Sequence, residues 1–87
     1  MKVTIYGAGH VGLVTGACLA DVGNDVLCVD VNEERVAALN RGEIPIYEPG
    51  LSKIILNNCE AGQLKFTTDA TEAVAHGVLQ FMAVGNW

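Results

Sequence analysis

Strand-favouring apolar residues gather in four short runs along this 87-residue chain. The runs cover Val3–Tyr6, Asp25–Asp30, Leu64–Thr67 and Val78–Val84. In the second run the apolar residues are consecutive rather than alternating, which is typical of a parallel strand that is covered on both faces. We therefore predict four strands, with the second one inside a parallel sheet.

Between the first two runs, apolar residues recur at steps of three and four, which is the spacing of one helix face. We predict a helix that ends at Gly23, with a buried face made of Val11, Val14, Cys18, Leu19 and Val22. Asn32 then begins a second helix as its N-cap, because acidic residues follow in the first turn, and Gly42 ends that helix. Val31 and Val36 stand where a hydrophobic staple would form across this cap.

Two more helices are predicted in the second half of the chain. A loop with two prolines, residues 43–50, leads into a helix whose apolar face begins at Leu51 and which ends at Gly62. Asp69 and Glu72 have the spacing of a capping box, so a short helix opens there and runs to His76. This alternation indicates an α/β fold with a Rossmann-like parallel sheet in the order 3-2-1-4 and helices on both faces.

Residues 1–87 are expected to form a single, partial dinucleotide-binding (Rossmann) domain. Apolar residues make up 51% of the sequence, which is more hydrophobic surface than so short a chain can readily hide. The composition therefore favours either a truncated domain or a subunit that pairs with another chain.

The first strand and the first helix are linked by a glycine-rich motif, Gly7-Ala8-Gly9-His10-Val11-Gly12. In a dinucleotide-binding fold Gly7 permits the tight turn, Gly9 lets a pyrophosphate approach the backbone, and Gly12 lets the helix pack against the strand. Asp30 ends the next strand 18 residues after Gly12, close to the spacing of about 20 that this fingerprint requires. The alternative is that these glycines only form a tight turn in a domain that binds no cofactor.

The position of Asp30 favours NAD as the cofactor. A carboxylate there accepts hydrogen bonds from the adenosine ribose and repels the 2′-phosphate of NADP. FAD is the alternative, because it uses the same fingerprint. Arg35 lies close to Asp30, in the first turn of the second helix, where it either covers the adenine face or is free in solvent. His10 and His76 have no identifiable acid–base partner, so we assign neither of them a catalytic role.

Charge and cysteine content argue against several other functions. The net charge is −5 and the basic residues are scattered, so the sequence offers no patch for nucleic acid or for an anionic membrane. No apolar run reaches the roughly 18 residues that a membrane span needs. No metal-binding spacing is present, and we expect reduced, buried thiols in a cytoplasmic protein for the three cysteines, Cys18, Cys28 and Cys59.

Residues 7–20, 29–32 and 42–51 together resemble one family closely. They are similar to the start of members of the UDP-glucose/GDP-mannose dehydrogenase family, and the proline-bearing segment 42–51 is the most specific of the three. The resemblance implies a two-step oxidation of UDP-glucose to UDP-glucuronate by two NAD⁺ in the complete protein. It also implies NAD contacts from Gly7, Gly9, His10, Val11, Gly12, Asp30, Arg35, Val84 and Gly85.

The same resemblance assigns no catalytic residue to this chain. The family's cysteine nucleophile, with its lysine and aspartate helpers, has no counterpart among these residues. The chain also departs from the family at Val84-Gly85-Asn86-Trp87, where Val-Gly-Thr-Pro is usual, and at His10, where tyrosine is usual. Gln80 is polar in a strand that is expected to be apolar.

Three hypotheses about function follow from the sequence. In the first, the chain is an NAD-binding module derived from a dehydrogenase, with no turnover of its own. In the second, it is a structural piece that has lost cofactor binding and forms a homodimer through its exposed fourth strand. In the third, it is one part of a complete dehydrogenase, so the sequence alone leaves its status as an enzyme open.

Overall fold

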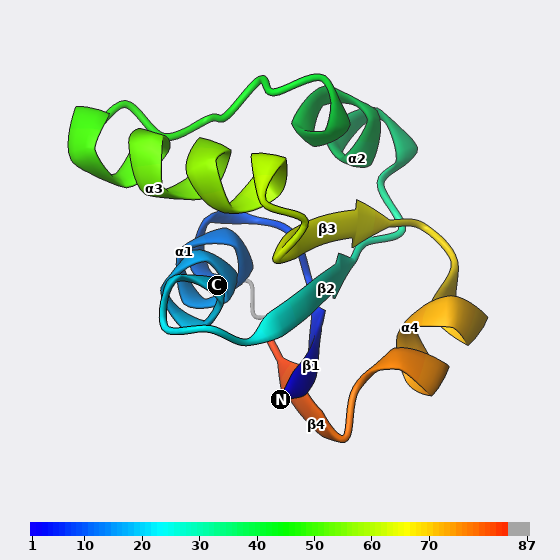
Figure 1. Cartoon of the computed structure of the whole chain (residues 1–87). Helices are drawn as coiled ribbons and strands as arrows, with labels where there is room; N and C mark the ends of the chain where they lie inside the picture. The colour runs from blue at the N-terminus through cyan, green and yellow to red at the C-terminus, as the bar shows by residue number, and fades with distance from the viewer. Residues whose placement is uncertain (84–87) are drawn as a thin grey trace.

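The computed structural model describes residues 1–83, which form a four-stranded parallel sheet with helices on both faces (Figure 1). The sheet consists of β1 (Lys2–Tyr6), β2 (Asp25–Val29), β3 (Leu64–Thr67) and β4 (Leu79–Met82). Their order is β3-β2-β1-β4, so the chain extends the sheet from β1 to one side and then returns to the other side of β1. The α/β class and the strand order predicted from the sequence are therefore confirmed.

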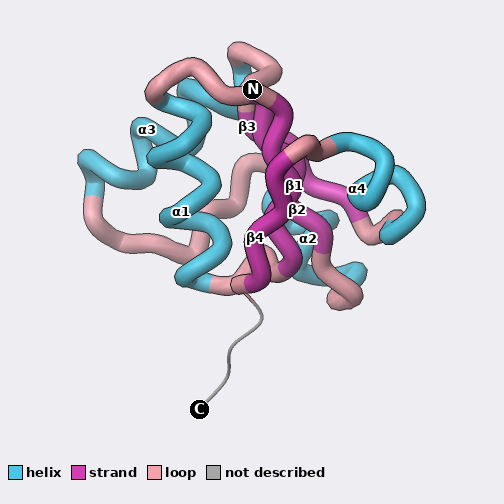
Figure 2. The backbone as a smooth tube through the Cα atoms, turned by 90° about the horizontal axis from the view of Figure 1, so that it is seen from below, coloured by secondary structure: helices cyan, strands magenta, loops and turns pink. Residues whose placement is uncertain are grey.

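The described strands are connected by α1 (His10–Asp21), α2 (Glu33–Asn40), α3 (Pro49–Glu60) and α4 (Ala70–His76). Helices α1 and α3 pack against each other on one side of the sheet, while α4 covers the opposite side (Figure 2). Helix α2 belongs to the first side, because Val36 and Leu39 share a hydrophobic core with Leu13 of α1. A smaller core on the α4 side contains Leu27, Val29 and Ala73.

Side-chain caps fix the residues at which three of these helices begin. Asn32 caps α2 by accepting a hydrogen bond from the amide of Arg35, and Asp69 caps α4 in the same way. Helix α3 begins earlier than the sequence predicted, at Pro49. The cause is Glu48, whose side chain accepts hydrogen bonds from the two amides that follow the proline, and proline itself suits the first helical position.

The predicted buried face of α1 is only partly right, since Val14 and Leu19 are half-buried and pack against the core. Val11 and Val22 are exposed by 64% and 76%, and Cys18 is also exposed, whereas the buried residues are Gly12, Leu13, Gly16, Ala17 and Ala20. The reason is the close approach of α1 to the sheet. A Cβ atom on Gly16 would lie 3.1–3.3 Å from three side-chain atoms, Cys28 Sγ, Ile5 Cδ1 and Leu64 Cδ1. Small residues fit where α1 meets the sheet, beside Leu13, whereas Val11 and Val22 face the solvent.

Two further sequence predictions are wrong in part. Val31 is 94% exposed and does not pack on the buried Val36, so the predicted staple is not formed. All three cysteines are free thiols, but only Cys28 is buried, while Cys59 is half-buried and Cys18 is exposed. Burial raises the pKa of the Cys28 thiol to about 12, so this group is protonated at neutral pH.

Among residues 1–83, none of the helices combines the length and the apolar character that a membrane crossing requires. The same residues contain no group of three or more His, Cys, Asp or Glu side chains that could hold a metal ion.

Candidate functional site

The glycine loop, residues 7–12, joins the carboxyl end of β1 to the amino end of α1. Gly7 has a φ of 119°, a conformation that favours glycine, and its amide donates to the Val29 carbonyl oxygen at 2.7 Å. A Cβ atom on Gly12 would lie only 1.9 Å from the Gly7 carbonyl oxygen. The turn therefore requires glycine at residue 7, and the close approach of helix to strand requires it at residue 12.

Gly9 leaves the amino end of α1 accessible. Among residues 1–83, a Cβ atom on this residue would meet only Arg35 Nη1, at 3.8 Å. Gly9 is the N-cap residue of α1, and no side chain of residues 1–83 caps the helix. The amides of the first turn therefore lack acceptors within the helix, and the helix dipole adds partial positive charge at the same point. Such a helix end is suited to binding the phosphate groups of a ligand.

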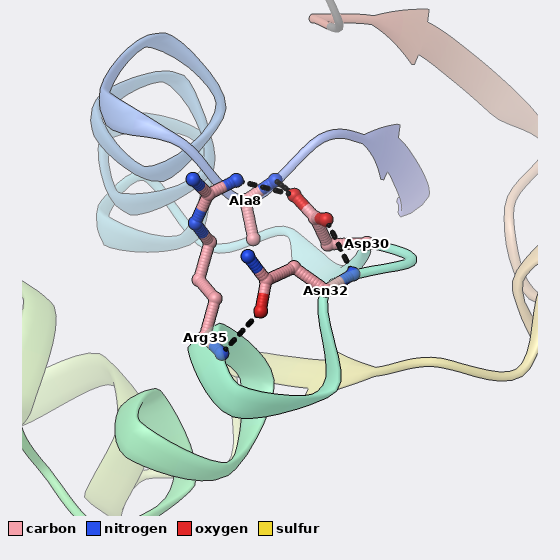
Figure 3. A network of polar contacts seen from close by, with 4 residues as sticks. All are labelled: Ala8, Asp30, Asn32 and Arg35. Atoms are coloured by element: carbon pink, nitrogen blue, oxygen red, sulfur yellow. Dashed lines mark hydrogen bonds and ion pairs between the residues drawn. The ribbon is translucent and has the colours of Figure 1, made fainter.

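Asp30 follows β2 directly and fastens the glycine loop (Figure 3). Its Oδ2 accepts hydrogen bonds from the Ala8 amide at 2.9 Å and from Arg35 Nη1 at 3.0 Å, while its Oδ1 accepts from the Asn32 amide at 2.9 Å. Burial disfavours the charged carboxyl group, but these hydrogen bonds and the charge of Arg35 outweigh burial and lower the pKa of Asp30 below its ordinary value. Asp30 is therefore ionised at neutral pH.

Arg35 reaches back from the first turn of α2 toward the glycine loop, where it meets Asp30 (Figure 3). The Arg35 side chain is 44% exposed, whereas the Asp30 side chain is 11% exposed. The sequence left two positions open for Arg35, against the adenine face or free in solvent, and neither of them includes this ion pair with Asp30. The guanidinium group is half in solvent, yet it is anchored beside Gly9 at the entrance to the loop.

A cavity of about 170 Å³ lies at the carboxyl ends of the strands, next to Asp30. Sequence reasoning missed most of its lining, which consists of Tyr6, Gly7, Val29, Asp30, Val31, Thr68 and Ala70. The signal that could have found these residues is positional, because ligands of open parallel sheets bind outside the carboxyl ends of the strands. Each of them stands at or just after the end of β1, β2 or β3.

The structure brings the glycine loop, Asp30 and Arg35 together at the carboxyl ends of β1 and β2. His10 and Val11 begin α1 with exposed side chains, and neither is part of the Asp30 network. Val84 and Gly85, the other two residues predicted to contact NAD, lie outside the described residues, as does the unusual ending at residues 86–87.

Gln80, which is polar in an otherwise apolar strand, has hydrogen-bond partners for both ends of its amide. Its Nε2 donates to the carbonyl oxygens of Val74 at 3.0 Å and Gly77 at 3.3 Å, and its Oε1 accepts from the Tyr6 hydroxyl at 2.6 Å. Because Tyr6 also lines the cavity, Gln80 steadies one of the cavity's walls.

Comparison with known proteins identifies relatives of this arrangement. Residues 1–86 match the NAD-binding domain of the UDP-glucose/GDP-mannose dehydrogenase family. The UDP-glucose 6-dehydrogenase of Rhizobium meliloti is 52% identical over 86 residues, which are 99% of this chain and 20% of that protein.

Two solved structures have the same fold over nearly the whole chain. GDP-mannose dehydrogenase from Pseudomonas aeruginosa, crystallised as a ternary complex, superposes with a TM-score of 0.91 and 37% identity, covering 100% of this chain and 20% of that one. UDP-glucose dehydrogenase from Pyrobaculum islandicum superposes with a TM-score of 0.85 and 38% identity, covering 95% of this chain and 19% of that one.

The chain spans about a fifth of the length of these relatives. The match over residues 1–86 is to the domain by which the family binds NAD, so NAD rather than FAD is the family's cofactor. The match and the fold together show that this chain belongs to the UDP-glucose/GDP-mannose dehydrogenase family and is its N-terminal NAD-binding domain.

Proposed function

We propose that the chain binds NAD across the carboxyl edge of its sheet, with the pyrophosphate on the glycine loop and the adenosine beside Asp30. The observation that carries this proposal is the junction of three features. These are the amino end of α1, the glycine loop and the ionised carboxylate of Asp30. The hydrogen bond from the Ala8 amide to Asp30 holds them together.

The pyrophosphate is the part of the cofactor that the glycine loop suits best. At Gly9 no group of the described residues lies nearer to an added Cβ atom than Arg35 Nη1, at 3.8 Å, so a phosphate can approach the backbone amides directly. The amides of the first turn of α1, from His10 onward, then donate to the phosphate oxygens. His10 and Val11 contribute through their backbone, which suits a position where the side chain departs from the family pattern.

The ribose hydroxyls are proposed to bind Asp30. An ionised carboxylate offers about four lone-pair positions. The Ala8 amide, the Asn32 amide and Arg35 Nη1 occupy three of them, which leaves one on Oδ1 for a ribose hydroxyl. A second hydroxyl can be accepted on Oδ2 if the exposed Arg35 side chain swings away, a movement that its position permits.

The cavity next to Asp30 suits the adenine ring. Its volume of about 170 Å³ is enough for a flat bicyclic base, and its lining is mostly apolar. Val31, which is 94% exposed, forms part of this lining. Covering Val31 with the base removes apolar surface from water and so favours binding.

For the complete protein we propose oxidation of a nucleotide sugar, with UDP-glucose as the substrate class. The identity to UDP-glucose 6-dehydrogenase over nearly the whole chain supports this assignment. No cysteine among residues 1–83 stands out as a nucleophile for that reaction. Burial raises the pKa of Cys28 to about 12 and also raises the pKa of the half-buried Cys59. Cys18 lies in the second half of α1, away from the amino end of the helix that faces the glycine loop. We therefore expect the chain alone to bind NAD without oxidising UDP-glucose. Its free thiols suit a reducing compartment, so we place the protein in the cytoplasm.

Titration of the ¹⁵N-labelled chain with NAD⁺ tests the binding mode. We expect the largest amide shifts at Ala8, Gly9, Val11 and Asp30, and small shifts at the far end of the sheet around Gly62. Adenosine alone should shift Asp30 and Val31 but not the amides at the start of α1. The absence of shifts in the glycine loop at millimolar NAD⁺ would contradict the proposal.

A second candidate function is homodimerisation through β4. Within the described residues β4 pairs only with β1, and its free edge exposes Leu79 by 42%, Phe81 by 38% and Met82 by 72%. An exposed apolar edge strand is a template for pairing with another strand. This role does not exclude NAD binding, because the glycine loop and β4 use different residues.

A further inference from the structure

Gln80 connects two walls of the cavity beside Asp30. Its Nε2 donates to the carbonyl oxygens of Val74 at 3.0 Å and Gly77 at 3.3 Å. The last carbonyl groups of a helix lack partners within the helix, so these two hydrogen bonds hold the carboxyl end of α4 to the sheet. At its other end α4 begins with Ala70, which forms part of the cavity lining.

The hydrogen bonds of Gln80 also determine which group donates in its contact with Tyr6. Both N–H groups of Nε2 serve the carbonyl oxygens at the end of α4, so Oε1 is the atom that meets the Tyr6 hydroxyl, at 2.6 Å. Because Oε1 can only accept, the hydroxyl donates its hydrogen to it. The Tyr6 side chain starts at the carboxyl end of β1 and is thereby drawn toward β4.

The position of the Tyr6 ring affects the cavity directly. Tyr6 lines the cavity and packs against the small core that contains Val29 and Ala73. Without the acceptor on Gln80 the hydroxyl would have to turn toward water, and rotation of the side chain about χ1 would carry the ring into the cavity of about 170 Å³. The hydrogen bond therefore keeps the ring at the side of the cavity.

We propose that Gln80 is a positioning residue for the adenine part of the cofactor. It holds Tyr6 directly and Ala70 through α4, so the cavity is formed before the base arrives. The inference rests on the proposed function, because the adenine ring must occupy this cavity. A site that is already formed costs less to order on binding. The polar residue in an otherwise apolar strand thus has a role in binding as well as in the fold.

Two ligands separate the cavity from the glycine loop. Adenosine 5′-diphosphate places a base in the cavity and phosphates on the loop, whereas inorganic pyrophosphate occupies the loop alone. Their dissociation constants are measured by titration of the ¹⁵N-labelled chain for the wild type, Gln80→Met and Tyr6→Phe. Tyr6→Phe keeps the ring and both bonds from Gln80 to the end of α4, so it tests the hydrogen bond even where Gln80→Met disturbs the helix.

We expect each of the two variants to weaken the binding of adenosine 5′-diphosphate by about three- to tenfold, the net value of one hydrogen bond. The dissociation constant of pyrophosphate should stay within about twofold of the wild-type value. The double variant should bind adenosine 5′-diphosphate no more weakly than Gln80→Met alone, because both single changes remove the same hydrogen bond.

The matched control is Gln63→Met. Gln63 also donates from its side-chain amide to a backbone carbonyl oxygen, that of Asn24 at 3.3 Å, but it stands at the amino end of β3, away from the cavity. This variant should leave both dissociation constants within about twofold of the wild-type values. An effect on adenosine 5′-diphosphate as large as that of Gln80→Met would contradict the inference.

Unchanged binding of adenosine 5′-diphosphate by Tyr6→Phe would overturn the inference, because the hydrogen bond would then have no part in forming the cavity. Equal weakening of both ligands would overturn it as well, since that pattern indicates a general loss of structure. Effects of the two single changes that multiply in the double variant would show that Gln80 and Tyr6 act independently. Failure of the wild-type chain to bind NAD⁺ and adenosine 5′-diphosphate would instead refute the proposed function.

Discussion

Gly9 and Gly12 are glycines for different physical reasons, although they belong to one motif. A Cβ atom at residue 12 would overlap the Gly7 carbonyl oxygen at 1.9 Å, whereas one at residue 9 would have no neighbour closer than 3.8 Å within the part of the chain that the structure describes. Gly12→Ala should therefore lower the free energy of unfolding by about 2–4 kcal/mol, while Gly9→Ala should change it by less than about 1 kcal/mol. Urea denaturation measures both values.

The same pair of variants separates stability from binding. Gly9→Ala places a methyl group where the pyrophosphate is proposed to approach, so it should weaken NAD⁺ binding at least about tenfold while the fold persists. A folded Gly9→Ala chain that binds NAD⁺ as tightly as the wild type would show that the phosphates lie elsewhere.

The carboxylate of Asp30 should make stability depend on pH in one direction. Its pKa is lower in the folded chain, so its contribution is complete above the unfolded aspartate value of about 3.9 and is lost as the pH falls from there through the folded pKa. We expect the stability difference between the wild type and Asp30→Asn to be constant above about pH 5 and to shrink as the pH falls below about 4. Thermal unfolding across this range measures the difference.

Salt separates Asp30 from an ordinary surface ion pair. The pKa of Glu43 is also lowered, by the hydrogen bond and charge of Arg41, but both side chains are about 60% exposed. Salt should therefore abolish the effect of Glu43→Gln on the free energy of unfolding. The effect of Asp30→Asn should persist in salt, because the hydrogen bonds from the backbone amides to Asp30 are not screened in this way.

In the pH experiment, a stability difference between the wild type and Asp30→Asn that did not change with pH would mean that the Asp30 carboxylate contributes nothing to holding the loop.

At this scale the sequence predicts residues whose role is local. Gly7 and Gly12 follow from the geometry of a tight turn, and Asp30 follows from its place at the end of a strand. The hydrogen bond between Ala8 and Asp30, in contrast, joins residues that are 22 apart in the sequence. The exposure of Val31 likewise depends on how distant parts of the chain pack around it. Such features are set by packing, so neither periodicity nor motif spacing could predict them.

Among the elements, α1 shows most clearly how packing overrides a sequence pattern. Its glycines and alanines are buried together with Leu13, whereas Val11 is exposed. A Cβ atom added to Gly16 would lie 3.1 Å from Cys28 Sγ. Gly16→Val should lower the free energy of unfolding by about 1–3 kcal/mol through overpacking. Val11→Ala, on the exposed side, should change it by no more than about 0.5 kcal/mol. If the valine at residue 11 proved the more sensitive of the two, the orientation of α1 would be wrong.

The elements themselves were predictable because their ends carry local signals. Asn32 and Asp69 cap helices, and glycines with positive φ follow three helices at residues 23, 42 and 62. The buried face of α1 was predictable only at Val14 and Leu19, because the glycines and alanines of that face give no hydrophobic stripe. These small residues let the helix approach the sheet closely, and this role becomes visible only in the folded structure.

At the scale of the molecule, one edge of β4 is paired with no other strand of residues 1–83, and this edge predicts association between copies of the chain. We expect sedimentation velocity to detect dimers at high protein concentration and Met82→Lys to abolish them, because a charged edge residue opposes strand pairing. Val22→Lys is the matched control, since Val22 is equally exposed but lies at the end of α1. A wild-type chain that stays monomeric at millimolar concentration would rule out this interface.

The hydrogen bond between Asp30 and the Ala8 amide also has a kinetic consequence. It ties the loop to the sheet before any ligand arrives, so the loop need not be ordered when the cofactor binds. Association of NAD⁺ should then follow a single exponential whose rate rises linearly with ligand concentration, without a slow phase of loop closure. The rate of cofactor exchange would then be set by the dissociation of NAD⁺. We expect this step to be faster when Arg35 readily re-forms its ion pair with Asp30.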